Sequence, residues 1–95
     1  MVLEIAELSI HAGREDEFAA AYREAVKEIE ATEGFRSARM TQGIETPTRF
    51  VLLVEWDTVE AHTEGFRNSD RYPRWRELVS PFFAADPQVQ HARFV

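Results

Sequence analysis

Residues 49–56 have the sequence RFVLLVEW, the clearest strand pattern in the chain. One face of this strand would carry four large apolar side chains, those of Phe50, Leu52, Val54 and Trp56. The opposite face would carry two more apolar side chains between two charged ones, in the order Arg49, Val51, Leu53 and Glu55. A strand with one face in water alternates apolar and polar residues, whereas positions 50–54 are all apolar. The pattern therefore predicts a strand whose two faces are both covered.

Three further segments of the chain have strand character. Residues 2–11 are rich in Ile and Leu, residues 35–44 are more polar, and residues 89–95 close the chain. Between the first two segments, apolar side chains recur at helical spacing, at Phe18, Tyr22, Ala25, Val26 and Ile29. This spacing predicts a helix with one apolar stripe that ends before Gly34.

A second helix is expected after the central strand, in two pieces. Asp57, with Glu60 three residues later, approximates a capping box and predicts a helix start near Thr58. Gly65 and the Asn-Ser-Asp cluster at 68–70 are expected to interrupt this helix. The serine or the aspartate of that cluster can cap the second piece.

The predicted order of elements is β-α-β-β-α-β over one domain, residues 1–95. This is the order of the ferredoxin-like α+β fold, in which a four-stranded antiparallel sheet carries both helices on one face. Two helices leave the other face of the sheet open, although residues 49–56 favour burial on both sides. Covering one more Leu or Phe side chain gains about 1.5–3 kcal/mol. We therefore expect a second copy of the chain on the open face, in a homodimer.

Composition excludes several classes of function. The net charge is −6 with a pI near 5.0, which argues against a nucleic-acid partner because such binding needs many Lys and Arg contacts to phosphates. The chain has no cysteine, so it has neither a thiolate nucleophile nor a Cys-ligated metal. The start MVLEIAEL has no basic region and no long apolar run. We expect neither a secretory signal nor a membrane partner, and the cytoplasm as the default location.

Two histidines are candidate bases. His62 lies four residues before Phe66, so both rings would share one side of the second helix, where a neutral imidazole can accept a proton. His91 shares a strand face with Val89, and the register decides whether it meets His62 in a cavity or faces outward. His11, at the end of the first strand, is expected at the surface. Three histidines without a close acidic partner make a weak metal signal, and we expect no metal.

Side chains of the second helix are candidate walls of a pocket. Tyr72 and Trp75 lie three residues apart, on a stripe that in most helices is core. Both carry a polar group that needs a partner when buried, and in a pocket these groups would orient a flat aromatic ligand. Arg76 or Arg49 could anchor a phenolate or carboxylate through paired donors.

Four stretches together resemble one known family. They are GFRS (34–37), RFVLLVEWD (49–57), EAHTEGFRNSDRYPRW (60–75) and PQVQHARF (87–94). The chain resembles the antibiotic biosynthesis monooxygenase superfamily, whose members are small dimeric α+β barrels. Members include cofactor-independent oxygenases of phenolic polyketides, quinol monooxygenases and haem-degrading enzymes. The haem-degrading members have Trp and His where this chain has Phe66 and Arg76, so the resemblance does not extend to haem degradation.

The resemblance implies a cofactor-free monooxygenase acting on a small aromatic, phenolic or quinol-type molecule. His62 or His91 would deprotonate a phenol, and the resulting carbanion would reduce dioxygen directly, with no cofactor. Phe66, Tyr72 and Trp75 would enclose the substrate. Two alternatives remain open: a non-catalytic dimeric module that binds a hydrophobic molecule in the same pocket, and a purely structural dimer whose rings are all core.

Overall fold

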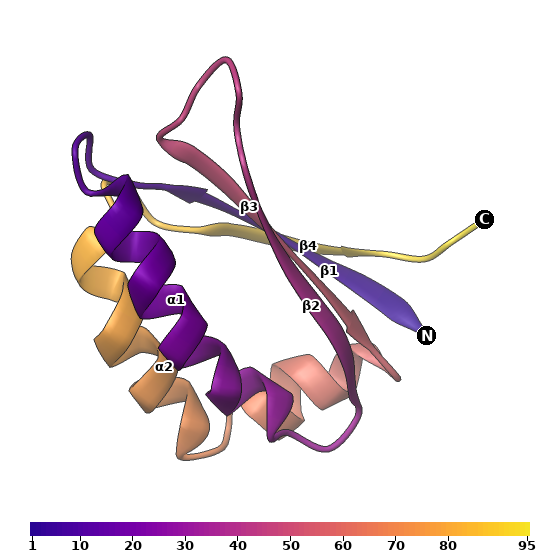
Figure 1. The fold of residues 1–95 in the computed structure, drawn as a ribbon. Helices are drawn as coiled ribbons and strands as arrows, with labels where there is room; N and C mark the ends of the chain where they lie inside the picture. The colour runs from indigo at the N-terminus through magenta and orange to yellow at the C-terminus, as the bar shows by residue number, and fades with distance from the viewer.

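The computed structural model describes residues 1–95 and has the predicted order of elements. These are β1 (Val2–Ser9), α1 (Glu15–Glu30), β2 (Phe35–Gln42), β3 (Arg49–Trp56), the π-helix η1 (Ala61–Phe66), α2 (Arg71–Val79), the 3₁₀ turn η2 (Ser80–Phe82) and β4 (Gln88–Ala92). The strands form one antiparallel sheet in the order β2-β3-β1-β4. Both helices lie on one side of this sheet (Figure 1), which confirms the ferredoxin-like α+β fold. No helix has the length and apolar character that a bilayer crossing requires.

The strand ends differ from the predicted ones by a few residues. The first strand was expected to reach residue 11, but β1 ends at Ser9 and Ile10 keeps only an isolated bridge to Phe83. The last strand was expected over 89–95, whereas β4 ends at Ala92. Ala92 pairs with Leu3, so almost no β1 backbone remains to bond the residues that follow.

The inner face of the sheet carries the core. The four predicted side chains of β3 are at most 3% exposed, and they pack with apolar side chains of β1 and α1. Phe18 of α1 meets Phe50 of β3 edge-on, with ring centroids 4.9 Å apart. The predicted stripe of α1 is thus the surface that covers the sheet.

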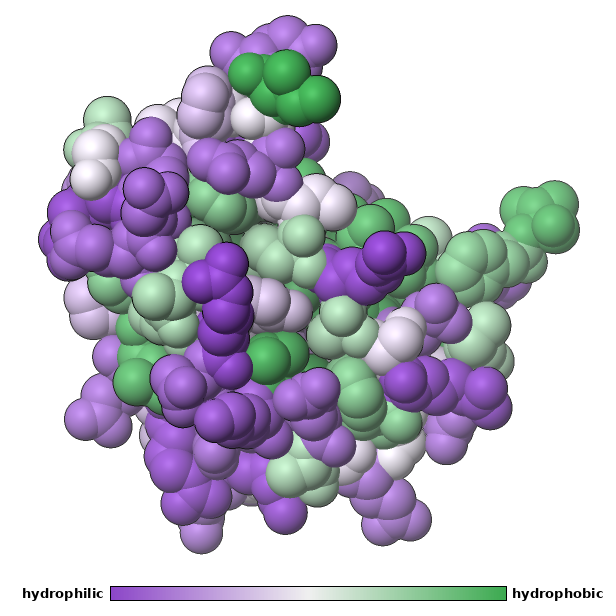
Figure 2. All heavy atoms as spheres, viewed as in Figure 1, coloured by the Kyte–Doolittle hydropathy of each residue, from purple (hydrophilic) through white to green (hydrophobic).

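The outer face of the sheet has no helix over it (Figure 1). Ile5 and Leu53 are paired across β1 and β3 on this face and are partly buried. Arg49 and Glu7 form an ion pair of 2.9 Å beside them. Apolar side chains also project at the tip of the β2–β3 hairpin, where Ile44 is 91% exposed, and at the C-terminal end (Figure 2).

The start of the second helical region differs from the prediction in its cap. The hydroxyl of Thr58 accepts the Ala61 N–H at 3.1 Å, whereas the carboxylate of Asp57 pairs with Arg36 across to β2. Gly65 does not interrupt the region, because it lies inside η1. The expected interruption comes after η1, where the Ser69 hydroxyl accepts the Arg71 N–H, and Asp70 is the N-cap residue of α2 without a side-chain cap bond.

Two glycines with positive φ give a test of how tightly η1 packs. Gly34 (φ +89°) joins α1 to β2, and a Cβ there would lie 2.7 Å from the Ala61 Cβ. Gly13 (φ +87°) has nothing within 4 Å of such an atom. Both Ala variants carry the same backbone strain, and we expect Gly34→Ala to destabilise the fold by about 2 kcal/mol more than Gly13→Ala. Urea unfolding measures the difference, and equal losses would contradict it.

Candidate active site

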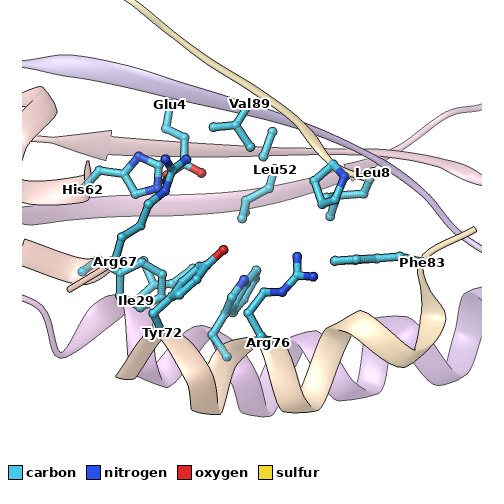
Figure 3. A pocket seen from close by; sticks show the side chains of 14 residues that line it. Glu4, Leu8, Ile29, Leu52, His62, Arg67, Tyr72, Arg76, Phe83 and Val89 are labelled. Carbon is cyan, nitrogen blue, oxygen red and sulfur yellow. Dashed lines mark ion pairs between the residues drawn. The ribbon is translucent and has the colours of Figure 1, made fainter. Parts of the chain in front are cut away.

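A cavity of about 50 Å³ lies between the inner face of the sheet and the second helical region (Figure 3). Nine of its fourteen lining residues are hydrophobic. The lining includes five of the six predicted site residues, namely His62, Phe66, Tyr72, Trp75 and Arg76. The cavity continues into an open groove bordered by Arg67, Tyr72, Arg76 and Asp86. The sixth predicted residue, His91, is not part of the cavity wall.

Helical spacing explains the wall that α2 contributes. Tyr72, Trp75 and Arg76 are three and four residues apart, which puts them on one face of the helix. Trp75 is 7% exposed and meets Tyr22 of α1 edge-on, at 6.2 Å between centroids. The Tyr72 hydroxyl and the Arg76 guanidinium point from α2 toward the sheet (Figure 3). The predicted stripe is therefore both core, at Trp75, and cavity wall.

The π-helix η1 turns His62 and Phe66 toward the end of β3. The His62 ring stacks on the Trp56 indole, with centroids 5.4 Å apart and planes 15° apart. Phe66 lies on the same side, 6.4 Å from the His62 centroid. Trp56 is fully buried on the inner face, so it belongs to this aromatic cluster and is not available as a contact on the outer face.

A buried carboxyl group connects these rings. Glu4 is 6% exposed and accepts the Trp56 indole N–H at 2.9 Å. The same oxygen lies 3.4 Å from Nε2 of His62. Nδ1 of His62 is in turn 2.8 Å from Nε2 of His91. Glu4, Trp56, His62 and His91 thus form one polar cluster at the inner end of the cavity, referred to below as the Glu4 cluster.

Strand register places His91 in this cluster. His91 pairs with Glu4 across β4 and β1, so both side chains point to the face that the helices cover. Of the two orientations that the sequence left open, the inward one is the orientation observed. His91 is partly exposed and lines a second surface hollow together with Val2 and Val59. It therefore reaches the cavity only through His62.

Burial changes the acid–base properties of the Glu4 cluster. It raises the pKa of Glu4, although the hydrogen bond from Trp56 and the positive charge of Arg67 act against the change. Burial lowers the pKa of His62 to about 3, helped by the charges of Arg67 and His91. Burial and Arg67 also lower the pKa of His91. At neutral pH both imidazoles are neutral, so the His62–Glu4 contact is not an ion pair there.

Sequence reasoning missed Glu4 and Arg67. The expectation that no acidic group lies close to the histidines is wrong, because Glu4 touches His62. Alternation along β1 was an available signal, since Glu4 falls on the same face as Ala6 and Leu8. No group of three or more His, Asp or Glu side chains is arranged to hold a metal ion. Arg49, the alternative anchor, lies on the outer face of the sheet.

Comparison with known proteins identifies the family. Residues 1–78 match the family model for antibiotic biosynthesis monooxygenases. The chain belongs to this family. It is 41% identical to the uncharacterized protein YczJ of Bacillus subtilis (strain 168) over 91 residues, which is 96% of each chain. The matched family region includes Glu4, His62 and Arg76 but ends before His91.

Solved structures of family members have the same fold. A candidate antibiotic biosynthesis monooxygenase from Bordetella bronchiseptica is 36% identical, with a TM-score of 0.96 over 99% of this chain and 96% of that one. A monooxygenase from the ActVA-Orf6 gene of Streptomyces coelicolor, solved with nanaomycin D, is 19% identical with a TM-score of 0.81, covering 96% of this chain and 84% of that one. At that identity the second likeness concerns the fold alone.

The depressed pKa of His62 predicts how stability depends on pH. Below its ordinary pKa of 6.5 the unfolded chain binds a proton at His62, whereas the folded chain stays unprotonated there down to about pH 3. Acidification therefore favours unfolding, by about 2 kcal/mol between about pH 7.5 and about pH 5. We expect His62→Gln to lose that much less stability than the original protein over this range. Urea unfolding at several pH values measures the difference.

His11→Gln is the matched control, because it removes a histidine that is exposed and is not part of the cavity lining. The raised pKa of Glu4 acts in the opposite direction above its ordinary value of 4.5, and it is present in all three proteins. The prediction would be contradicted by parallel pH profiles of His62→Gln and the original protein.

Proposed function

We propose that this family member is a cofactor-independent monooxygenase that oxidises a small phenol or quinol in the cavity. The observation that carries the proposal is the Glu4 cluster, a buried carboxyl group beside two neutral imidazoles at the end of an aromatic cleft. Titratable groups with shifted pKa values in an apolar cleft are typical of catalytic sites. His62 and His91 stay in the proposed site, but the predicted role of proton acceptor passes from them to Glu4.

Magnitudes favour Glu4 as the group that takes the proton. A phenol has a pKa of about 10, so transfer to an imidazole of pKa about 3 would cost roughly 9 kcal/mol. The pKa of Glu4 is raised, so the difference in pKa between the phenol and Glu4 is smaller than that between the phenol and His62. The carboxyl group of Glu4 also lines the cavity. In this scheme His91 donates to Nδ1 of His62, which leaves His62 with its proton on Nε2, facing Glu4. The two imidazoles then support the carboxylate as donors in series.

The reaction balances with dioxygen as the only oxidant. Glu4 takes the phenolic proton, and the phenolate passes one electron to O₂, which gives a phenoxyl radical and superoxide. These combine through a new C–O bond, and the peroxide receives the proton from Glu4. Glu4 then removes the proton from the same carbon while the O–O bond breaks, so that a quinone and water leave. The apolar wall keeps bulk water from the radical pair.

The size of the cavity supports a small substrate. Pockets for drug-sized molecules measure about 300–1,000 Å³, far more than the roughly 50 Å³ present here. Tyr72 and Arg76 are partly exposed where the cavity opens into the groove, and rotation of these side chains would widen it. A single aromatic ring is therefore the ligand we propose.

The outer face of the sheet supports the homodimer as part of this proposal. Leu53 and Ile5 lie side by side on a face that no helix covers, next to an ion pair between exposed side chains. A second copy packed on this face would bury these apolar side chains and complete the two-sided burial that β3 favours. The helices and the cavity would then lie away from the interface.

Oxygen uptake tests the proposed reaction. With hydroquinone as substrate, we expect oxygen consumption that falls at least ~100-fold in Glu4→Gln and in His62→Ala, because each change removes the proton acceptor or its donor partner. An oxygen electrode measures the rate. His11→Gln controls for the loss of a histidine outside the cavity and should keep the original rate. Full turnover in Glu4→Gln would overturn the assigned role, and ligand binding without oxygen uptake would favour the non-catalytic module.

Sedimentation tests the homodimer. A charge in the centre of the outer face would remain buried and unpaired in a dimer, so we expect Leu53→Arg to sediment as a monomer at micromolar concentration, where the original protein sediments as a dimer. Ala20→Arg adds the same charge to the exposed side of α1 and should remain dimeric. A monomeric original protein would remove this part of the proposal.

A further inference from the structure

Arg76 is one of six among the ten arginines of this acidic chain that form no ion pair with a carboxylate. Four others form ion pairs, namely Arg14, Arg36, Arg49 and Arg74. Arg76 forms none, and its guanidinium lies 5.5 Å from the centroid of the Phe83 ring. Its side chain is only partly exposed and lines both the cavity and the open groove into which the cavity continues. The protein supplies no anion to pair with the Arg76 guanidinium, so an anionic group of a ligand could take that place.

The other charged groups near the opening do not neutralise Arg76. Asp86 borders the same groove but makes no ion pair with it. Arg67 also borders the groove, and its charge acts on Glu4 and the two histidines at the inner end. The opening therefore has two cations and one anion, whereas the whole chain has a net charge of −6.

The cavity has two chemically different ends. Glu4 and His62 lie at one end, Arg76 and Phe83 lie toward the other, and the Tyr72 hydroxyl points into the space between them (Figure 3). One end offers a proton acceptor, the middle is apolar and aromatic, and the other end offers a guanidinium fork. A fork of this kind binds a carboxylate through two parallel hydrogen bonds.

We propose that the substrate is an aromatic acid, with a phenolic hydroxyl at the Glu4 cluster and a carboxylate bound by Arg76. This inference rests on the proposed function for the phenolic end and on Arg76 alone for the acidic end. The carboxylate holds the ring by its far side, so the hydroxyl is directed toward Glu4. Phe83 limits the positions of the guanidinium and thereby the orientation of the ligand.

A matched pair of ligands tests the charge preference. Para-hydroxycinnamate and its amide have the same shape, but only the acid carries a negative charge at neutral pH. We expect the acid to bind the full-length protein about tenfold or more tightly than the amide at low salt, because only the acid pairs with Arg76. Isothermal titration calorimetry measures both dissociation constants, and the difference should shrink as salt is added.

Two variants test whether the preference for the acid over the amide depends on Arg76. Arg76→Gln should bind the acid and the amide with about equal affinity, because neither ligand then meets a guanidinium. Arg71→Gln removes the same charge from the same helix, but at a residue outside the cavity lining, and should keep most of the preference. Equal binding of the two ligands by the original protein, or equal losses in the two variants, would overturn the proposal.

The binding test of the aromatic acid can fail or succeed independently of the oxygen-uptake test of the proposed reaction. Hydroquinone has no carboxylate, so its oxidation tests the Glu4 cluster independently of Arg76. Oxygen uptake with hydroquinone but no binding of the acid would overturn the aromatic-acid proposal and leave the monooxygenase proposal standing. Preference for the acid that depends on Arg76, without oxygen uptake from either molecule, would support the binding site and overturn the reaction.

Discussion

A carboxyl group on the covered face of a sheet must find its partners inside the protein, and Glu4 imposes this constraint here. Water cannot solvate it, because the two helices close that face, and an unpartnered buried carboxyl group would cost several kcal/mol. Trp56 from β3 meets the need with a hydrogen bond of 2.9 Å. His62 from η1 stacks on Trp56 and lies 3.4 Å from the same oxygen. One buried acid thus ties two strands and the π-helix together.

The same burial gives the site its chemical character. Removing Glu4 from water favours its neutral form, and removing His62 from water favours the neutral imidazole. The two groups therefore move in opposite directions, which separates a stronger base from a neutral hydrogen-bonding partner. His91 extends the cluster to the surface beside β4, through a contact of 2.8 Å. The contacts that join β1, β3 and η1 are therefore made by the same buried groups whose pKa values are shifted.

The two faces of the sheet differ in what covers them. The inner face, under α1 and α2, holds the core and the small cavity, whose two ends differ in charge and hydrogen bonding. The outer face has no helix over it and carries Ile5 and Leu53 beside the ion pair of Arg49 and Glu7. A substrate would enter from the groove beside α2, on the side away from that surface. Family membership accounts for the arrangement of the elements, whereas the charges and the small volume of the cavity are features of this chain.

The sequence by itself determined the fold and most of the cavity wall, because those depend on local periodicity. The two-residue period of a strand gave the two faces of β3, and helical spacing put Tyr72, Trp75 and Arg76 on one side of α2. Only the tertiary structure decided the polar centre. Its hydrogen bonds join residues 52 and 29 positions apart, and strand register, which sequence alone leaves open, turned His91 inward. Glu4 gained its role for the same reason, since its partners come from β3 and η1.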